Sequence, residues 1–510
     1  MVFQRNVPLS RHKTALPFVV VLFLIGAVLS GTALSVFGQD PFQQISQTDK
    51  LIFQYQKVYA LTGVRVVVGN GQTLNNITIV LKNGLIDALG ANVPVPNEAE
   101  VINGTGLTVY SGFVDAHTSL GLGRRTTPVA APTAAPAQPS QRPTTAQTQQ
   151  QATTPEPNTY KADPNLRPNQ VAFDEIDFND TNFQSAREAG IGVALSINQQ
   201  GVFPGKSSVV STYTSDPLFG VIKNSSFQFI QYSSSRGGYP STLMAVVAFQ
   251  RQALMDAQYY MNLEDWYIAG PRGMTRPTFD PAIHSLYPVI RGEETVVIPV
   301  STELDIKRAL DLAKQFKLKY ILSGVVEGYR AIDQLKAVKV PLIVSVSYPQ
   351  PRSTTGYAFY PQITPYEKTP PPGAPAQPQT QRATEELDKM IQDQLYANAS
   401  VLYKAGLQFV ISAGSDYRNF IKNFRSAVNA GLPADVALAK ITTEPAQFLG
   451  IADVAGTVET GKIANIVVTD GDLFSDKTAI KYVFIDGKKV EFAPPSAPAA
   501  GQQQRIRGDN

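Results

Sequence analysis

Hydrophobic positions in the middle of the chain follow two periods in turn. From Glu303 to Phe316 apolar residues recur every three to four positions, as on one face of a helix, and a short apolar run follows at 320–325. The same order, helix and then apolar strand, returns in 332–348 and in 385–416. Repeated units of this kind predict parallel strands joined by crossover helices. Over 111–450 they favour an α/β fold with a (β/α)8 TIM-like barrel. A doubly wound open sheet is the alternative, although no glycine-rich phosphate loop supports it.

Both ends of this middle region carry a different pattern. Short β-branched runs alternate with Gly and Asn turns in 57–110, and the pattern returns in 451–492. The first segment reads as a small antiparallel sheet with hairpins. Because isolated hairpins are unstable in water, the two segments are expected to pair. We therefore predict a small β-sandwich formed as a composite domain by both ends of the mature chain.

Three tracts rich in Pro, Ala and Gln interrupt or end this organisation. Two are predicted as low-complexity insertions in the barrel, at 126–158 and 369–384, and the third is the tail 493–510. None of them offers enough apolar surface to order itself, so we expect solvated loops and a disordered tail.

The first 38 residues resemble a targeting segment. A basic region is followed by an apolar run from Ala15 to Gly38 that ends in small residues. This pattern is typical of an export signal peptide over 1–38, cleaved before Gln39, and it predicts a periplasmic or cell-surface protein. An uncleaved membrane anchor is the alternative, since the run is nearly long enough to span a bilayer.

Composition narrows the chemistry that remains. The net charge of +3, from 44 basic and 41 acidic residues among 510, gives no sign of a nucleic-acid partner. The absence of cysteine excludes disulfides, Cys-ligated zinc and a thiol nucleophile. Of three histidines, His12 lies in the leader, so only His117 and His284 remain for catalysis or metal binding.

Candidate chemistry begins at the stretch SGFVDAHTSLGLG, residues 111–123. A strand-like run delivers His117, with Asp115 before it and Ser119 after it. Alternate residues of a strand face the same way, so His117 and Ser119 are expected on one face. Serine is a poor zinc ligand. Ser119, His117 and Asp416 also have the composition of a nucleophilic triad, but side chains two apart on a strand rarely point at each other.

Several segments resemble the amidohydrolase superfamily, closest to its imidazolonepropionase-like members. The stretch GFVDAHTS at 112–119 resembles the family's first barrel strand, which reads Pro-Gly-hydrophobic-hydrophobic-Asp-x-His-x-His. ISAGSD at 411–416 resembles the end of the eighth strand, and TGKIANIVV at 460–468 resembles the return strand. The resemblance implies a (β/α)8 barrel with a β-sandwich, and hydrolysis of amide-like C–N bonds.

The resemblance also implies a metal site, of which this chain keeps two residues. His117 matches the first strand-one histidine, and Asp416 matches the strand-eight aspartate that binds metal and moves a proton from the attacking water. The histidines expected near 299–301 and 323–325 are absent, and Ser119 replaces the second strand-one histidine. His284 matches no ligand of the family's metal site. For Glu303, Asp305 and Glu327 the expected role is helix capping or solvated charge.

Too few ligands remain to hold a hydrolytic ion, so the site is predicted to be degenerate. We expect an exported protein of the amidohydrolase family with lost or much reduced catalysis and without a resident cofactor. The alternative is an active amidohydrolase with a reduced or unusual site for zinc or another divalent metal, acting on a cyclic amide or small peptide. The expected partners are a small amide or peptide substrate, and further copies of the chain or an intact amidohydrolase paralogue in an oligomer.

Overall fold

The computed structural model describes residues 57–69, 71–123, 163–213, 220–233, 238–349 and 378–492. The predicted signal peptide, the insertion 126–158 and the tail 493–510 lie outside these ranges. Of the tract 369–384, the described part begins at Pro378, where helix α9 (Pro378–Lys404) starts.

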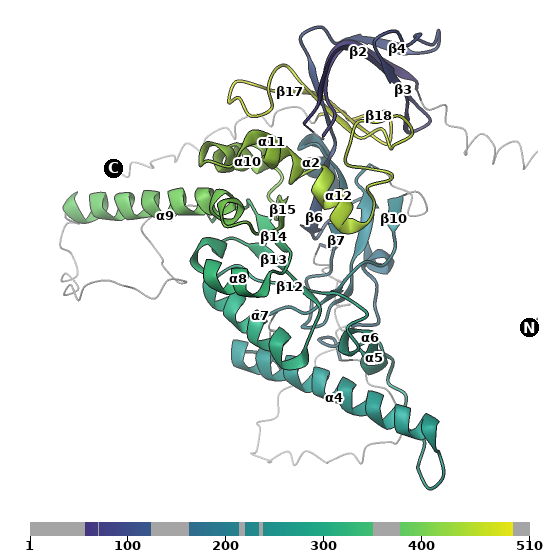
Figure 1. Ribbon diagram of the computed structural model, residues 1–510, viewed down its shortest axis with the longest axis vertical. Helices are drawn as coiled ribbons and strands as arrows, with labels where there is room; N and C mark the ends of the chain where they lie inside the picture. Colours follow the sequence, from purple (N-terminus) through teal and green to yellow (C-terminus); the bar gives the residue numbers. More distant parts are fainter. Residues whose placement is uncertain are drawn as a thin grey trace, which may run out of the picture. The chain divides into compact units, whose positions relative to one another are not determined.

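The two β-rich segments form one sheet, drawn in purple-blue and yellow in Figure 1. Its strands are β1 (Tyr59–Val67), β2 (Thr73–Lys82), β3 (Leu85–Gly90), β4 (Glu100–Asn103), β5 (Thr108–Ser111), β16 (Ile466–Thr469), β17 (Ile480–Ile485) and β18 (Lys488–Lys489). Their order is β18-β17-β16-β5-β1-β2-β3, and β4 pairs with β1. As the sequence pattern indicated, the two ends of the chain pair, through antiparallel β5 and β16.

Two expectations about this sheet need correction. The N-terminal segment is not simply antiparallel, because β1 runs parallel to both β4 and β5. The hairpin turn between β2 and β3 is as expected, since Asn83 and Gly84 both have positive φ, 53° and 78°. All eight strands belong to one mixed sheet, so the predicted β-sandwich is not confirmed.

The middle of the chain forms two further sheets. One has the order β10-β9-β7-β6 and the other β15-β14-β13-β12-β11-β8. The strands are β6 (Phe113–Thr118), β7 (Ile191–Ser196), β8 (Gly205–Lys206), β9 (Ser208–Ser211), β10 (Val221–Lys223), β11 (Gln228–Phe229), β12 (Val296–Pro299), β13 (Tyr320–Val325), β14 (Leu342–Ser345) and β15 (Phe409–Ser412). The predicted parallel order holds from β11 to β15 and between β6 and β7.

The parallel pattern breaks at β8 and β9, which Ser207 alone separates in the chain. Strand β9 runs antiparallel to β7, and β8 runs antiparallel to β11. Helix–strand periodicity could not predict this reversal, because no helix stands before either strand. Apolar side chains from strands of both sheets nevertheless share one buried cluster, which includes Val114, Val193, Val209, Phe229, Val297, Ile321, Ile343 and Val410.

Helices cover these strands. They are α2 (Asn182–Glu188), α4 (Leu243–Ala269), α5 (Pro281–His284), α6 (Tyr287–Ile290), α7 (Glu303–Phe316), α8 (Ile332–Val338), α9, α10 (Phe420–Asn429), α11 (Ala434–Ala439) and α12 (Thr443–Leu449), with short 3-10 turns at Ala172–Glu175 and Gly328–Arg330. Helix α7 has the bounds that its apolar period predicts, and a capping box of Thr302 and Asp305 starts it. The Glu327 carboxylate accepts from the backbone N–H of Glu303 at 3.2 Å, so the capping role is confirmed for Asp305 and Glu327, whereas the Glu303 carboxylate pairs with Lys307 at 2.6 Å.

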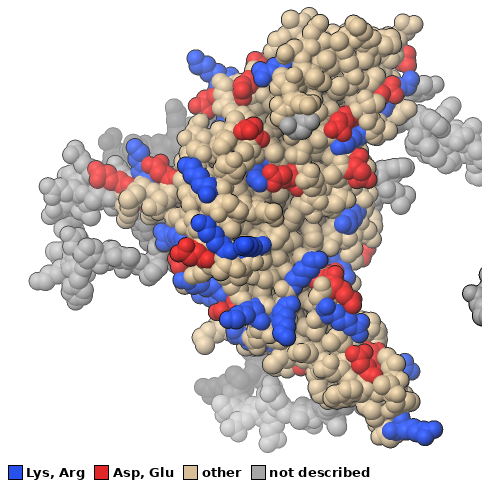
Figure 2. Space-filling view, viewed as in Figure 1, with Lys and Arg blue, Asp and Glu red and all other residues tan. Residues whose placement is uncertain are grey.

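The surface of the described part carries both signs of charge. Figure 2 shows basic and acidic side chains interspersed over the face in view, without separation into fields of one sign. None of the helices in the described ranges combines the length and the apolar content needed to cross a membrane.

Candidate functional site at the strand ends

Strand β6 carries the predicted site, and it is not regular. Asp115 lies opposite Ala194 and Thr118 lies opposite Ser196, so three steps along β6 match two along β7. Such a β-bulge adds one residue and interrupts the alternation of faces. The strand ends at Thr118, and Ser119 lies beyond it. The expectation that His117 and Ser119 stand on one face of a regular strand is therefore wrong.

Asp115 joins β6 to β15. Its buried carboxylate accepts hydrogen bonds from the backbone N–H groups of His117 and Ala413, each at 3.1 Å. In return, the Ser412 hydroxyl donates to the His117 carbonyl at 3.0 Å. Burial raises the pKa of Asp115 to about 6, although hydrogen bonds from the Ser412 side chain and from the two backbone N–H groups act to lower it. Asp115 is therefore a structural link whose oxygens are already engaged.

His117 presents a neutral imidazole. Burial lowers its pKa to about 4, so the ring is uncharged at neutral pH. The centre of its ring lies 6.2 Å from that of Phe229, and Phe229 belongs to the apolar cluster that the strands share. The Nδ1 atom is buried and has no hydrogen-bond partner among the described residues. An unpartnered buried nitrogen of this kind is available to a ligand.

Asp416 follows β15 and is held by its own turn. Both of its carboxylate oxygens accept from the Asn419 side-chain amide, at 3.0 and 3.2 Å, and its backbone N–H donates to the Ala413 carbonyl. No hydrogen bond joins Asp416 to His117 or Ser119 in the described part of the chain, so the geometry does not support the nucleophilic triad. His284 is exposed at the end of α5, between the rings of Phe279 and Tyr287.

The ends of three neighbouring strands, β13, β14 and β15, carry buried serines. Ile321, Ile343 and Val410 belong to the shared apolar cluster. Since alternate strand residues face the same way, the residues two positions later face the same interior. These are Ser323, Ser345 and Ser412, all of them buried.

The sequence alone did not predict this layer of serines. The available signal was that each serine stands two positions after an apolar residue of a short strand. The Ser323 hydroxyl has no hydrogen-bond partner among the described residues, whereas the buried hydroxyl of Tyr417 interacts with the side chains of Ser415 and Thr118. Burial raises the pKa of Tyr417, and the charge of Asp115 raises it further, so the phenol stays protonated. The strand ends thus offer several neutral hydroxyls and one neutral imidazole.

The donor set does not fit a hydrolytic metal. Among the residues that the structure describes, no group of three or more His, Cys, Asp or Glu side chains is arranged to hold an ion. A working zinc site takes three protein ligands, typically imidazoles, thiolates or carboxylates. Here the carboxylate of Asp115 accepts hydrogen bonds from backbone N–H groups, and that of Asp416 accepts from the Asn419 side chain. Serine hydroxyls are weak ligands. Of the candidate ligands described here, His117 provides a free ring nitrogen.

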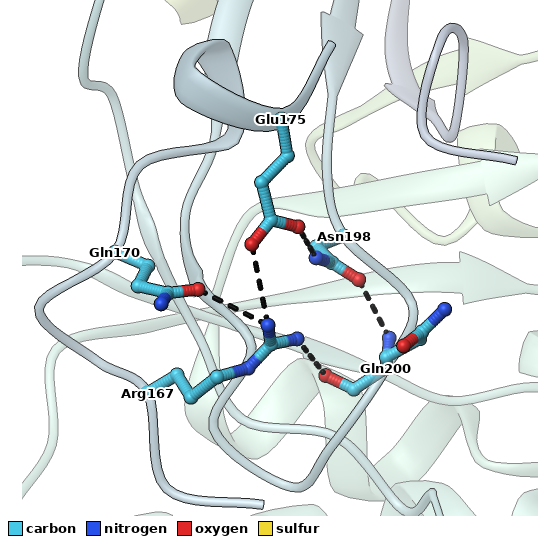
Figure 3. Close-up of polar contacts among 5 residues, drawn as sticks. All are labelled: Arg167, Gln170, Glu175, Asn198 and Gln200. Carbon is cyan, nitrogen blue, oxygen red and sulfur yellow. Dashed lines mark hydrogen bonds and ion pairs between the residues drawn. The ribbon is translucent and has the colours of Figure 1, made fainter. Parts of the chain in front are cut away.

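A polar network fixes the loop that follows β7 (Figure 3). Arg167 contacts Glu175 at 3.2 Å and Gln170 at 3.1 Å, and it also donates to the Gln200 carbonyl at 3.4 Å. Asn198 bridges the system, because its amide donates to Glu175 and its oxygen accepts from the Gln200 backbone N–H at 2.9 Å. No periodic pattern in the sequence singles out these residues, because they come together only in the folded chain. The network ties 167–175 to the loop beyond β7, at the same strand ends as His117.

Comparison with known proteins agrees with this architecture. Residues 386–490 match the sequence profile of the Amidohydrolase family. The structure is similar to that of an amidohydrolase from Thermotoga maritima MSB8, with a TM-score of 0.59 and 19% identity over 85% of this chain and 100% of the other. It is less similar to molinate hydrolase (TM-score 0.45, 14% identity, 88% and 97% covered) and to A. niger ochratoxinase (TM-score 0.42, 12% identity, 88% and 98% covered). No curated protein sequence matches the chain. The chain therefore has an α/β fold like that of the Thermotoga amidohydrolase.

Proposed function

We propose that this protein binds a small amide or peptide at its strand ends and does not hydrolyse it through a metal-activated water. The observation that carries the proposal is the state of the two carboxylates, since Asp115 is engaged by backbone N–H groups and Asp416 by Asn419. A general base for a metal-bound water needs a free carboxylate beside at least three metal ligands. The serine layer and His117 provide hydrogen bonding in place of that chemistry.

The ligand class follows from the unpartnered atoms. An amide offers one N–H donor and one carbonyl acceptor. The neutral Nδ1 of His117 can accept from the N–H group, and an unpartnered hydroxyl such as that of Ser323 can donate to the carbonyl. Buried polar groups without partners are unfavourable until a ligand satisfies them. The proposal therefore assigns His117 to ligand binding.

A closed barrel belongs to this proposal. The direct hydrogen bonds between β6 and β15 support closure on one side, and the single residue between β8 and β9 supports it on the other.

The proposal also places the protein in the imidazolonepropionase-like branch and in the periplasm or at the cell surface. Support for those two points comes from the sequence: the stretch at 112–119 and the apolar leader.

A second candidate function is an active hydrolase with a reduced metal site. One observation favours it: the Nδ1 of His117, which is buried and free, could bind an ion as well as a hydrogen-bond donor. His117 alone does not supply the remaining ligands that such a site needs.

Metal content and ligand binding separate the two functions. After growth with added zinc or manganese, we expect less than about a tenth of an equivalent of metal in the purified protein. Titration calorimetry with a dipeptide should give binding that His117→Ala weakens and that Ser119→Ala, the matched control beyond the strand, leaves unchanged. Bound metal near one equivalent, together with dipeptide or imidazolone turnover that Asp416→Asn abolishes, would overturn the proposal in favour of the second candidate.

A further inference from the structure

A second candidate ligand site lies away from the strand ends, where α4 meets the segment 276–287 (Figure 1). It is a cavity of about 390 Å³, and it shares no residue with the strand-end site. Helix α4 contributes residues three and four positions apart, which therefore lie on one helix face. Four aromatic side chains line the cavity: Tyr260, Tyr267, Phe279 and Tyr287.

Charges of both signs line the same cavity. Glu264 stands on the α4 wall, and Arg276 stands on the opposite segment. Among the described residues neither of them forms an ion pair. Neighbouring charges do pair: Asp265 lies 3.7 Å from Arg291, and Lys206 lies 2.9 Å from Glu294. In the described part of the chain, Glu264 and Arg276 thus lack the counter-ions that their neighbours have.

Glu264 has a neutral partner. Tyr287 donates a hydrogen bond to it, and burial together with the negative charge of Glu264 raises the pKa of Tyr287 to about 12. The phenol therefore remains a donor at neutral pH, and it orients the carboxylate without neutralising it. The third charged residue of the lining, Asp280, is occupied differently, because its carboxylate caps α5 by accepting from the N–H groups of Ala282 and Ile283.

We propose that this cavity binds a small zwitterion with an aromatic or apolar body, such as a free amino acid of the phenylalanine class. Glu264 receives the ammonium group, and Arg276 receives the carboxylate in the paired geometry that guanidinium favours. The aromatic walls attract the ammonium through their faces and cover the ligand's ring. The volume lies within the range of roughly 300–1,000 Å³ that is usual for small-ligand sites.

Titration calorimetry on the full chain tests this with three probes of matched shape. L-Phenylalanine carries both charges, phenethylamine only the amine and 3-phenylpropanoate only the carboxylate. We expect L-phenylalanine to bind at least about tenfold more tightly than either analogue, a difference of about 1.4 kcal/mol. Glu264→Gln and Arg276→Gln should each weaken its binding by about tenfold or more.

The matched controls are Asp265→Asn, next to Glu264 on the same helix, and Arg272→Gln, an exposed arginine before Arg276 that does not line the cavity. Both should bind L-phenylalanine like the wild type, and circular dichroism checks that every variant is folded. Three results would overturn the proposal: no binding heat up to about 10 mM L-phenylalanine, equal binding of phenethylamine, or unchanged affinity in Glu264→Gln. His117→Ala should leave this binding intact, so failure at the strand ends and failure here are distinguishable.

Discussion

Asp115 and Glu264 are two carboxylates that the protein uses in different ways. At the junction of β6 and β15, Asp115 accepts from two backbone N–H groups and is almost completely buried. In the cavity between α4 and α5, Glu264 has a tyrosine hydroxyl as its partner and no paired cation in the described part of the chain. Backbone donors make a carboxylate part of the framework, whereas a single neutral donor leaves most of its charge available. The two carboxylates therefore differ in how much of their charge is already satisfied inside the fold.

Removing the first carboxylate should have the largest effect. Asp115→Ala leaves the N–H groups of His117 and Ala413 without their acceptor in the interior. We expect the free energy of unfolding to fall by about 3–5 kcal/mol, measured by urea denaturation. The exposed Asp174→Ala is the control and should change it little. A loss below about 1 kcal/mol in Asp115→Ala would show that the junction does not depend on this side chain.

The pH dependence of stability should separate Asp115 from His117. Burial raises the pKa of Asp115 from 3.8 to about 6, so the folded state gains stability as the pH falls from 6 towards 4. Burial lowers the pKa of His117 from 6.5 to about 4, so over the same interval the unfolded chain takes up the proton and the folded state loses stability. The two contributions oppose each other in the wild type.

Removing the histidine should expose the carboxylate's contribution. Between about pH 6 and about pH 4 the unfolded state of the wild type protonates the histidine, and this contribution lowers the stability of the wild type. Relative to the wild type, the free energy of unfolding of His117→Gln should therefore rise by about 2 kcal/mol over this interval. Denaturation curves at closely spaced pH values measure this difference. Parallel profiles for the two proteins would contradict the assignment of a neutral His117.

At the second carboxylate the effect should be smaller. Tyr287→Phe keeps the ring and removes the hydrogen bond to Glu264, so we expect a loss of about 1 kcal/mol in the free energy of unfolding. Tyr260→Phe, on the α4 wall of the same cavity, is the control and should be close to neutral. A loss as large as that of Asp115→Ala would remove the contrast between the two regions.

The smallest effect is expected at the ion pair beside the cavity. Asp265 and Arg291 are 3.7 Å apart, and their side chains are 57% and 44% exposed. Asp265→Asn should lower the free energy of unfolding by less than about 0.5 kcal/mol, and added salt should diminish even that. Denaturation at low and high salt measures it. A loss above about 1 kcal/mol would mean that this pair supports the cavity wall.

Local patterns in the sequence predicted much of the scaffold. The period of apolar residues gave the bounds of α7, and the apolar run at 320–325 is strand β13. The pairing of the two chain ends followed from the instability of lone hairpins. These features depend on residues close in sequence or on strong alternation, which is why they can be read without a structure.

Features that depend on tertiary geometry could not be predicted in the same way. The bulge in β6 arises from the register with β7, and it removes Ser119 from the strand that its spacing implied. Asp115 lies two positions before the candidate histidine, but the Ala413 N–H that donates to its carboxylate is distant in sequence. Residue type and spacing singled out His117 and Asp416 as candidate ligands; they could not show that Asn419 holds the carboxylate of Asp416.

The seam between β5 and β16 has a consequence for how the polypeptide folds. Thr469 donates to the Thr108 carbonyl across a separation of 361 residues, and β16 lies between β5 and β17 in the sheet. Until the segment that forms β16 has left the ribosome, the edge of β5 that pairs with β16 is exposed. An exposed strand edge favours association with other nascent chains. A chain truncated before residue 466 should therefore aggregate, and chaperone protection of the early strands should matter more here than in a protein whose sheets close locally.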